Sequence, residues 1–322
     1  MTLRSTLVVS SEARAGEGDS RAATLTNVRL CELLDGKEGE SVGYSIFSET
    51  MADMTFQQVE ETATKKLPVL FPIGVIEEHG PHLPLGTDTY LAYQSCQHVK
   101  LALAELGVPA LIAPPYYWGI NHVTSGFAGS FTVRPETMVE VLCDALVCLK
   151  TWGFEHVFPL NEHGDFAHLA TMLAAVRKAH EELGVGAFFI VPESQIGAYG
   201  LRGDEPFLLV DTSHPCLAPP VLPEYVDVHA GGRETSLMLK CFPELVDESL
   251  ARSLESSRTA PHMMLEWVQG GTIAREITPL GYCGDPSDID LESEVVEGFA
   301  VSWPRDTANL IRNFLPPRVD QR

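Results

Sequence analysis

Short apolar runs alternate with longer amphipathic stretches along most of the chain. The run at 67–74 predicts a buried strand, and further strands are expected at 110–113, 156–161 and 187–191. Helices are expected from about 233 and at 55–66, 88–106, 135–151, 165–183, 247–270 and 290–314. Strands that alternate with helices in this order indicate βαβ units. We therefore expect an α/β fold of three layers, with a mostly parallel central sheet flanked by helices.

The first fifty residues do not share this alternation. Residues 1–22 are polar and rich in glycine and serine, and the apolar groups within 23–50 are short. We expect residues 1–50 to be an N-terminal extension that is partly disordered or contacts another subunit. Residues 51–322 then form one domain, since no internal repeat divides them.

The chain is strongly acidic. Its 44 Asp and Glu against 22 Lys and Arg give a net charge of −22, which disfavours nucleic acid and anionic membranes as partners. No stretch approaches the roughly 18 apolar residues of a membrane span, and the apolar run near the N-terminus is too short for a signal peptide. The seven cysteines are scattered without a CxxC pair, which is typical of reduced thiols. We expect a cytoplasmic protein.

The richest chemistry follows the first predicted strand. Glu77 and His79 are two residues apart, so an extended chain projects both side chains from one face. A loop with two glycines and two prolines then leads to Asp88. Carboxylates with an imidazole are the ligands of a zinc- or manganese-type hydrolytic centre. The alternative is an ordinary solvated polar loop, which the position at the carboxyl end of a strand disfavours.

Two further segments carry similar side chains. His163 and Asp165 follow the strand at 156–161, and they share the first crevice if the two strands are neighbours. We expect His163 to be a ligand, whereas Asp165 is equally suited to be a ligand, a helix N-cap, or both. His229 and Glu234 stand beside a glycine pair at a helix start. They offer a general acid/base pair or another ligand, although a glutamate in the first turn is favourable without any function.

These segments together resemble a known family. GVIEEHGPHLPLGTD, at 74–88, is similar to the signature G-S-x-E-Q-H-G-P-H-L-P-L-x-T-D of the creatininase (creatinine amidohydrolase) superfamily. NEHGD and HAGGRETS, at 161–165 and 229–236, resemble its N-G-H-G-G-N and H-A-G-x-x-E-T-S elements. Looser matches at 126–132 and 281–286 follow in the family's order.

The resemblance implies two divalent metal ions per chain, zinc first, with manganese or iron as alternatives. Glu77 and His163 would hold one ion, His79 and Asp165 the other, and Asp88 would bridge them. His229 would match a proton-transfer histidine, with Glu234 as a second catalytic residue. Substrate contacts would come from Asn121, Gly164 and Tyr225. The resemblance also implies a homohexamer.

The activity expected from this resemblance is hydrolysis by metal-activated water of a carbonyl-centred bond in a small polar substrate. That bond would belong to a cyclic amide, a formamide or a cyclic ketone, such as an oxidised inositol ring of the 3-dehydro-scyllo-inosose type; the family also includes a peptidase. Gly164 stands where creatininase has a tyrosine, so we expect a substrate other than creatinine. Alternatives from other classes are a non-hydrolytic metal-binding or sugar-isomerising protein and an amidase with a cysteine nucleophile. A serine triad is disfavoured because no G-x-S-x-G elbow is present.

Overall fold

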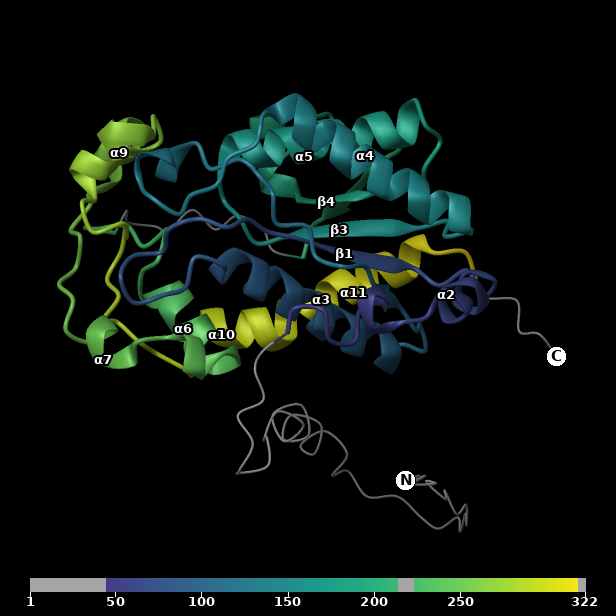
Figure 1. Ribbon diagram of the computed structural model, residues 1–322, viewed down its shortest axis with the longest axis horizontal. Coiled ribbons are helices and arrows are strands. Elements are labelled where there is room, and N and C mark those ends of the chain that lie inside the picture. The colour runs from purple at the N-terminus through teal and green to yellow at the C-terminus, as the bar shows by residue number, and fades with distance from the viewer. Residues whose placement is uncertain (1–44, 214–222, 318–322) are drawn as a thin grey trace, which may run out of the picture. The chain divides into compact units, whose positions relative to one another are not determined.

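The computed structural model describes residues 45–213 and 223–317 and has a parallel sheet at its centre (Figure 1). Strand β1 (Val69–Ile73) lies between β2 (Leu111–Ile112) and β3 (Val157–Asn161). Strands β4 (Phe189–Pro192) and β5 (Leu208–Asp211) form a second parallel pair. Backbone hydrogen bonds at Val157 join the two sets, so all five strands run in one direction.

Helices cover both faces of this sheet, which confirms the expected α/β layers. Helices α4 (Pro135–Trp152) and α5 (Phe166–Glu181) lie over one face, and α3 (Thr87–Glu105) and α11 (Trp303–Phe314) over the other (Figure 1). The shorter α2 (Phe56–Ala63) joins the first of these layers through its contact with α4.

The alternation of side chains in β1 explains the two layers. Val69, Phe71 and Ile73 belong to a core cluster shared with α4 and α5. Leu70, which points the other way, packs in a second cluster with residues of α3 and α11. Because every residue of β1 is buried, the strand reads as one apolar run rather than an alternating one.

Local signals set the helix ends much as expected. Thr55 caps α2 in a capping box, in which its hydroxyl accepts from the Gln58 N–H and the Gln58 side chain accepts from the Thr55 N–H. Helix α2 ends at Ala63 rather than at residue 66. Helix α6 (Gly232–Cys241) begins at the glycine pair, where a helix start was predicted.

The expected helical region at 247–270 is wrong as one element. It divides into α7 (Glu248–Ala251) and α8 (Met264–Trp267), and α9 (Gly271–Ile277) follows. The interruption contains Arg258 with a φ of 51° and Pro261, neither of which suits a helix interior. Strand β5 was also missed, because the segment 193–207 between it and β4 offers no amphipathic helix to mark a βαβ unit.

The helix expected at 290–314 is present but irregular. Helix α10 (Glu294–Glu297) passes through a π-helical turn, Gly298–Ser302, into α11. Pro304 has no N–H, so the Phe299 carbonyl cannot find its π-helical donor five residues on. His98 on α3 donates to that carbonyl instead, from Nδ1 at 3.2 Å.

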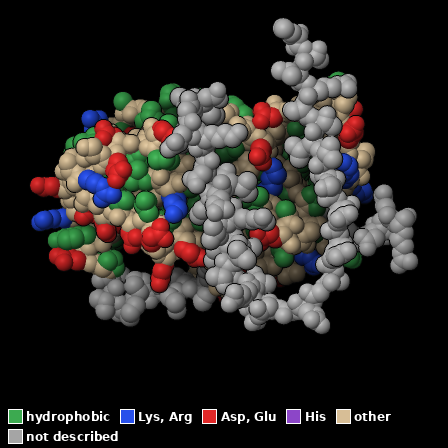
Figure 2. All heavy atoms as spheres, turned by 90° about the horizontal axis from the view of Figure 1, so that it is seen from below, with side chains coloured by type: hydrophobic (Ala, Val, Ile, Leu, Met, Phe, Trp, Pro, Cys, Tyr) green, Lys and Arg blue, Asp and Glu red, His purple; other side chains and the backbone are tan. Residues whose placement is uncertain are grey.

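The described surface is charged, and the described cysteines are unpaired. On the face in Figure 2, acidic and basic side chains are interspersed rather than gathered into one patch. No helix in the described ranges is long and apolar enough to cross a membrane. Five cysteines fall within these ranges, and all are free thiols. The predicted extension at 1–50 lies outside the described residues except for 45–50.

Candidate metal centre

The two strand-end motifs meet because their strands are direct neighbours. Strand β1 pairs with β3 in parallel register up to Ile73 and Asn161, so the loops after both strands leave the same edge of the sheet. Gly74 then lets the start of α3 approach closely, since a Cβ there would lie 2.7 Å from the Thr89 Cα. This approach brings Asp88, in the first turn of α3, to the end of β1.

One group of metal-binding side chains forms around His163. Its Nδ1 lies 3.0 Å from Glu77 Oε1 and 2.9 Å from Asp88 Oδ2. All three side chains are buried, and their ligand atoms lie close enough together to hold one ion.

A second group forms around His79. Its Nε2 lies 3.2 Å from Asp88 Oδ1 and 3.8 Å from Glu234 Oε2. These three ligand atoms also lie close enough together to hold an ion. Asp88 therefore belongs to both groups, and it presents a different carboxylate oxygen to each. A carboxylate shared in this way is suited to bridge two cations.

The orientation of the two histidine rings suits metal binding. His163 Nε2 lies 3.0 Å from the Ile120 carbonyl and His79 Nδ1 lies 3.2 Å from the Glu77 carbonyl. A carbonyl only accepts, so both these nitrogens carry protons. The other nitrogen of each neutral ring is then a lone pair that faces carboxylates. A backbone carbonyl that fixes the ring in this way is a usual partner of metal-binding histidines.

Electrostatics support the same conclusion. Burial lowers the pKa of His163, but the carboxylates of Glu77 and Asp88 outweigh it and raise the pKa well above its ordinary value. Asp88 Oδ2 is buried and faces His163 Nδ1 at 2.9 Å, so among the described residues it receives a hydrogen bond only when that nitrogen is protonated. A proton or a metal ion must fill this position, and the donor set of two carboxylates and an imidazole fits a divalent ion.

Comparison with known proteins agrees with this geometry. The family model of creatininase, described as creatinine amidohydrolase, matches residues 52–293.

The chain belongs to the creatininase family.

Relatives within this family differ in what they act on. A mycofactocin precursor peptide peptidase of Mycolicibacterium smegmatis is 28% identical over 225 residues, which cover 68% of this chain and 74% of that protein. A 3-dehydro-scyllo-inosose hydrolase of Thermotoga maritima is 26% identical over 251 residues, covering 77% and 73%. A crystal structure of creatininase shares the fold with a TM-score of 0.60 at 20% identity, covering 84% of this chain and 99% of that one.

His229, from the third creatininase motif, lies against the first group. Its Nε2 is 2.9 Å from the Glu78 carbonyl, so this nitrogen carries a proton and Nδ1 faces Glu77 Oε1 at 3.9 Å. Burial lowers the pKa of His229, but Glu77, Glu78 and Glu234 raise it to about 10. The ring can therefore hold and release a proton beside the centre, and it could also join Glu77 and His79 around an ion.

Asp165 is a helix N-cap, which is one of the roles predicted for it. Its Oδ1 accepts from the N–H groups of Ala167 and His168 at the start of α5. Its Oδ2 accepts from the N–H groups of His122 and Val123. Both oxygens are thus occupied by backbone donors, and Asp165 is in none of the metal-binding groups found in the described residues.

The predicted substrate contacts lie in different surroundings. Asn121 is fully buried, and its side chain donates to the carbonyls of Ile76 and Phe131. Tyr225 is 39% exposed and does not line the cavity described below, whereas Gly164 does. Asn121 therefore holds two loops together, and Gly164 is the residue of this set that lines the cavity.

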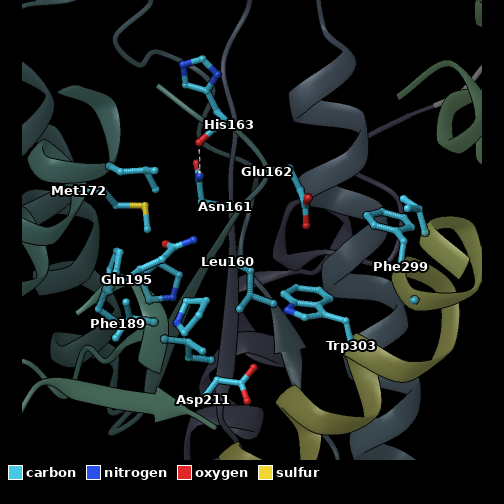
Figure 3. Close-up of a pocket in the computed structure, with 18 of the residues that line it drawn as sticks. Leu160, Asn161, Glu162, His163, Met172, Phe189, Gln195, Asp211, Phe299 and Trp303 are labelled. Atoms are coloured by element: carbon cyan, nitrogen blue, oxygen red, sulfur yellow. Dashed lines mark hydrogen bonds between the residues drawn. The ribbon is translucent and has the colours of Figure 1, made fainter. Parts of the chain in front are cut away.

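A cavity of about 640 Å³ opens beside the metal groups. His163 and Glu234 line it, and it continues between β3, β4 and the π-helical turn (Figure 3). Cavities of this size hold small-molecule ligands, so one side of the centre is accessible to a substrate.

Several polar side chains beside the metal groups were not predicted from the sequence. Glu78 faces His229, with Oε1 3.4 Å from Nε2, and the Thr124 hydroxyl donates to Glu77. Glu162 lines the cavity, and burial raises its pKa to about 7. Burial also lowers the pKa of His168 to about 3 beside His163. Glu78 and Glu162 adjoin motif residues in sequence, which was the available signal.

Substitution of Gly281 by alanine should destabilise the protein through Glu78. Gly281 has a φ of +81°, and a Cβ would lie 1.9 Å from Glu78 Oε2. We expect the free energy of unfolding to fall by about 1–3 kcal/mol, measured by urea denaturation. Gly197→Ala is the control, because no atom lies within 4 Å of a Cβ there. Equal stability of the two variants would contradict the expectation.

Proposed function

We propose that this creatininase-family hydrolase binds two divalent cations and hydrolyses a carbonyl-centred bond. The observation that carries the proposal is the division of Asp88 between two ligand groups, with Oδ1 towards His79 and Oδ2 towards His163. Glu77 completes the first group. Glu234 completes the second, in the place that the resemblance gave to Asp165.

The ligand chemistry suits several divalent metals, among which the resemblance puts zinc first. Imidazole and carboxylate ligands suit zinc, manganese and iron alike. Creatininases that share this fold are known in a manganese form and in a form with two zinc ions. We therefore propose zinc, with manganese and iron as alternatives.

Two such cations would lower the pKa of water from about 15.7 towards about 7 and polarise a carbonyl oxygen. The chain's own residues supply the remaining steps. Glu77, His79, Asp88, His163 and Glu234 would hold the cations beside the cavity, which His163 and Glu234 line. His229 holds a proton at Nδ1, fixed in orientation by the Glu78 carbonyl, and delivers it to the leaving atom.

We infer the substrate class from the kind of bond that is cleaved, a carbonyl-centred one, rather than from any single relative. Relatives in the family cleave a peptide precursor and an inosose, so an amide and a cyclic ketone both remain in the proposal. We propose an amide first, as cyclic amide, formamide or peptide, and an oxidised inositol ring second. We further propose a cytoplasmic homo-oligomer, a hexamer by resemblance, which light scattering would test.

Chelation should abolish this activity, and zinc should restore it. The full-length chain is incubated with EDTA, and hydrolysis of cyclic amides, formamides, short peptides and cyclic ketones is measured before and after addition of zinc or manganese. The expected result is loss of at least about 10³-fold in rate, because the cations supply the nucleophile and the charge stabilisation. Full activity in EDTA would contradict the proposal.

The same experiment separates the other classes. A binding protein or isomerase would gain thermal stability from zinc without releasing a hydrolysis product. A cysteine amidase would survive EDTA and lose activity to iodoacetamide. Two of the described thiols are poor candidates for the latter, since burial raises the pKa of Cys241 to about 12 and that of Cys283 to about 11, which leaves them as weak nucleophiles.

A further inference from the structure

The cavity continues well beyond the metal groups. It occupies about 640 Å³ and reaches from His163 to Asp211, the last residue of β5 (Figure 3). This volume lies within the range that binds drug-sized ligands and exceeds what a single scissile carbonyl requires. The substrate therefore has a part that lies away from the reacting bond.

Asp211 is the distinctive group at the far end. Its side chain is only 6% exposed, and in Figure 3 the carboxylate faces the space below Leu160 and Trp303. Oδ1 accepts from the N–H of Ser213 at 2.9 Å and from its hydroxyl. No Lys, Arg or His of residues 45–213 and 223–317 forms an ion pair with it.

The hydrogen bonds from Ser213 do not explain why residue 211 is a charged aspartate. Both hydrogen bonds reach the same oxygen, and an asparagine would offer an equivalent acceptor without a buried charge. A carboxylate removed from water with no cation beside it is costly unless a partner arrives. Oδ2 takes part in neither of these hydrogen bonds, so it is the oxygen that such a partner would meet.

The surrounding side chains suit an organic cation. Trp303, Phe299 and Phe189 also line the cavity, with Trp303 beside Asp211 (Figure 3), and aromatic faces attract ammonium and guanidinium groups. The cation among the described lining residues, Arg233, lies next to Glu234 in sequence, and its charge lowers the pKa of Glu162. Neither Arg233 nor any other basic lining residue that the structure describes forms an ion pair with Asp211.

We propose that Asp211 binds an amine or guanidinium group at the end of the substrate remote from the scissile bond. The proposal deepens the proposed function, because it assigns a cationic substrate to the same cavity. It leads to a specificity-determining role for Asp211, with no part in the bond cleavage itself.

The test compares two probes of nearly equal shape, n-butylguanidinium and n-butylurea, by calorimetric titration of the full-length chain saturated with zinc. Zinc prevents the guanidinium from occupying the carboxylates of the metal centre. Asp211→Asn keeps the acceptor for Ser213 and removes the charge. Asp144→Asn, on the exposed surface of α4, is the matched control.

We expect wild type and Asp144→Asn to bind the guanidinium at least about tenfold more tightly than the urea. In Asp211→Asn this preference should disappear, with an unchanged affinity for the urea and an unchanged melting temperature. Equal affinities of wild type for both probes, or a preference retained in Asp211→Asn, would overturn the proposal. Since no turnover is measured, charge-dependent binding in a protein without hydrolase activity would refute the proposed function and leave the cation site standing.

Discussion

Asp88→Asn should release both metal ions and lower kcat/KM by at least about 10³-fold. The amide has nearly the shape of the carboxylate, but it has lost the negative charge shared between His79 and His163. One of its two terminal atoms becomes an N–H donor and cannot bind a cation. Metal content per chain, measured by mass spectrometry after gel filtration, tests the expectation directly.

Asp144→Asn is again the control, because it removes one carboxylate from an exposed helix surface. It should keep two ions per chain and wild-type activity. If Asp88→Asn lost only one ion, Asp88 would be an ordinary ligand of one site. If it kept both, the bridging role of Asp88 would be wrong.

His229→Gln should lower kcat by about 10²–10⁴-fold while both metal ions stay bound. The glutamine amide can still donate to the Glu78 carbonyl, which His229 Nε2 contacts at 2.9 Å. It cannot hold a transferable proton at the position of Nδ1. We therefore expect little change in KM, measured by steady-state kinetics on the substrate found by the screen above.

The metal content of His229→Gln distinguishes a proton carrier from a ligand. His229 also stands near Glu77 and His79 in a group that could hold an ion, so loss of an ion would identify it as a ligand. His262→Gln, an exposed histidine elsewhere in the chain, should behave as wild type.

The sequence predicted those residues of the candidate centre that directly follow a strand. Glu77 and His163 follow apolar runs that could only be buried strands, and their meeting required just that these strands be neighbours, as they are. Glu234 as the partner of His79 was not predictable in this way. It arrives on α6 from a distant part of the chain, and no local periodicity specifies how that helix packs against the start of α3.

For Asp165 the sequence pattern did not decide between two roles. Its spacing from His163 suits a ligand, and its position before a helix suits a cap, so the pattern alone left both open. The structure supplies four backbone N–H groups to its oxygens, two from α5 and two from the loop after Asn121. The second pair depends on tertiary contact, and no sequence rule would have found it.

The π-helical turn beside the cavity makes Pro304 and His98 depend on each other, although they lie far apart in the sequence. Pro304 removes the donor that the Phe299 carbonyl would use, and His98 replaces it from 201 residues away. Gln94 donates to the other nitrogen of His98 at 2.9 Å, because Nδ1 already carries the proton. Substitution of His98 by a side chain without a donor would leave the Phe299 carbonyl without this hydrogen bond, unless Pro304 were also replaced. The proline and the imidazole therefore act together on the wall that carries Phe299 and Trp303, so a double substitution at 98 and 304 should cost less stability than the His98 substitution alone.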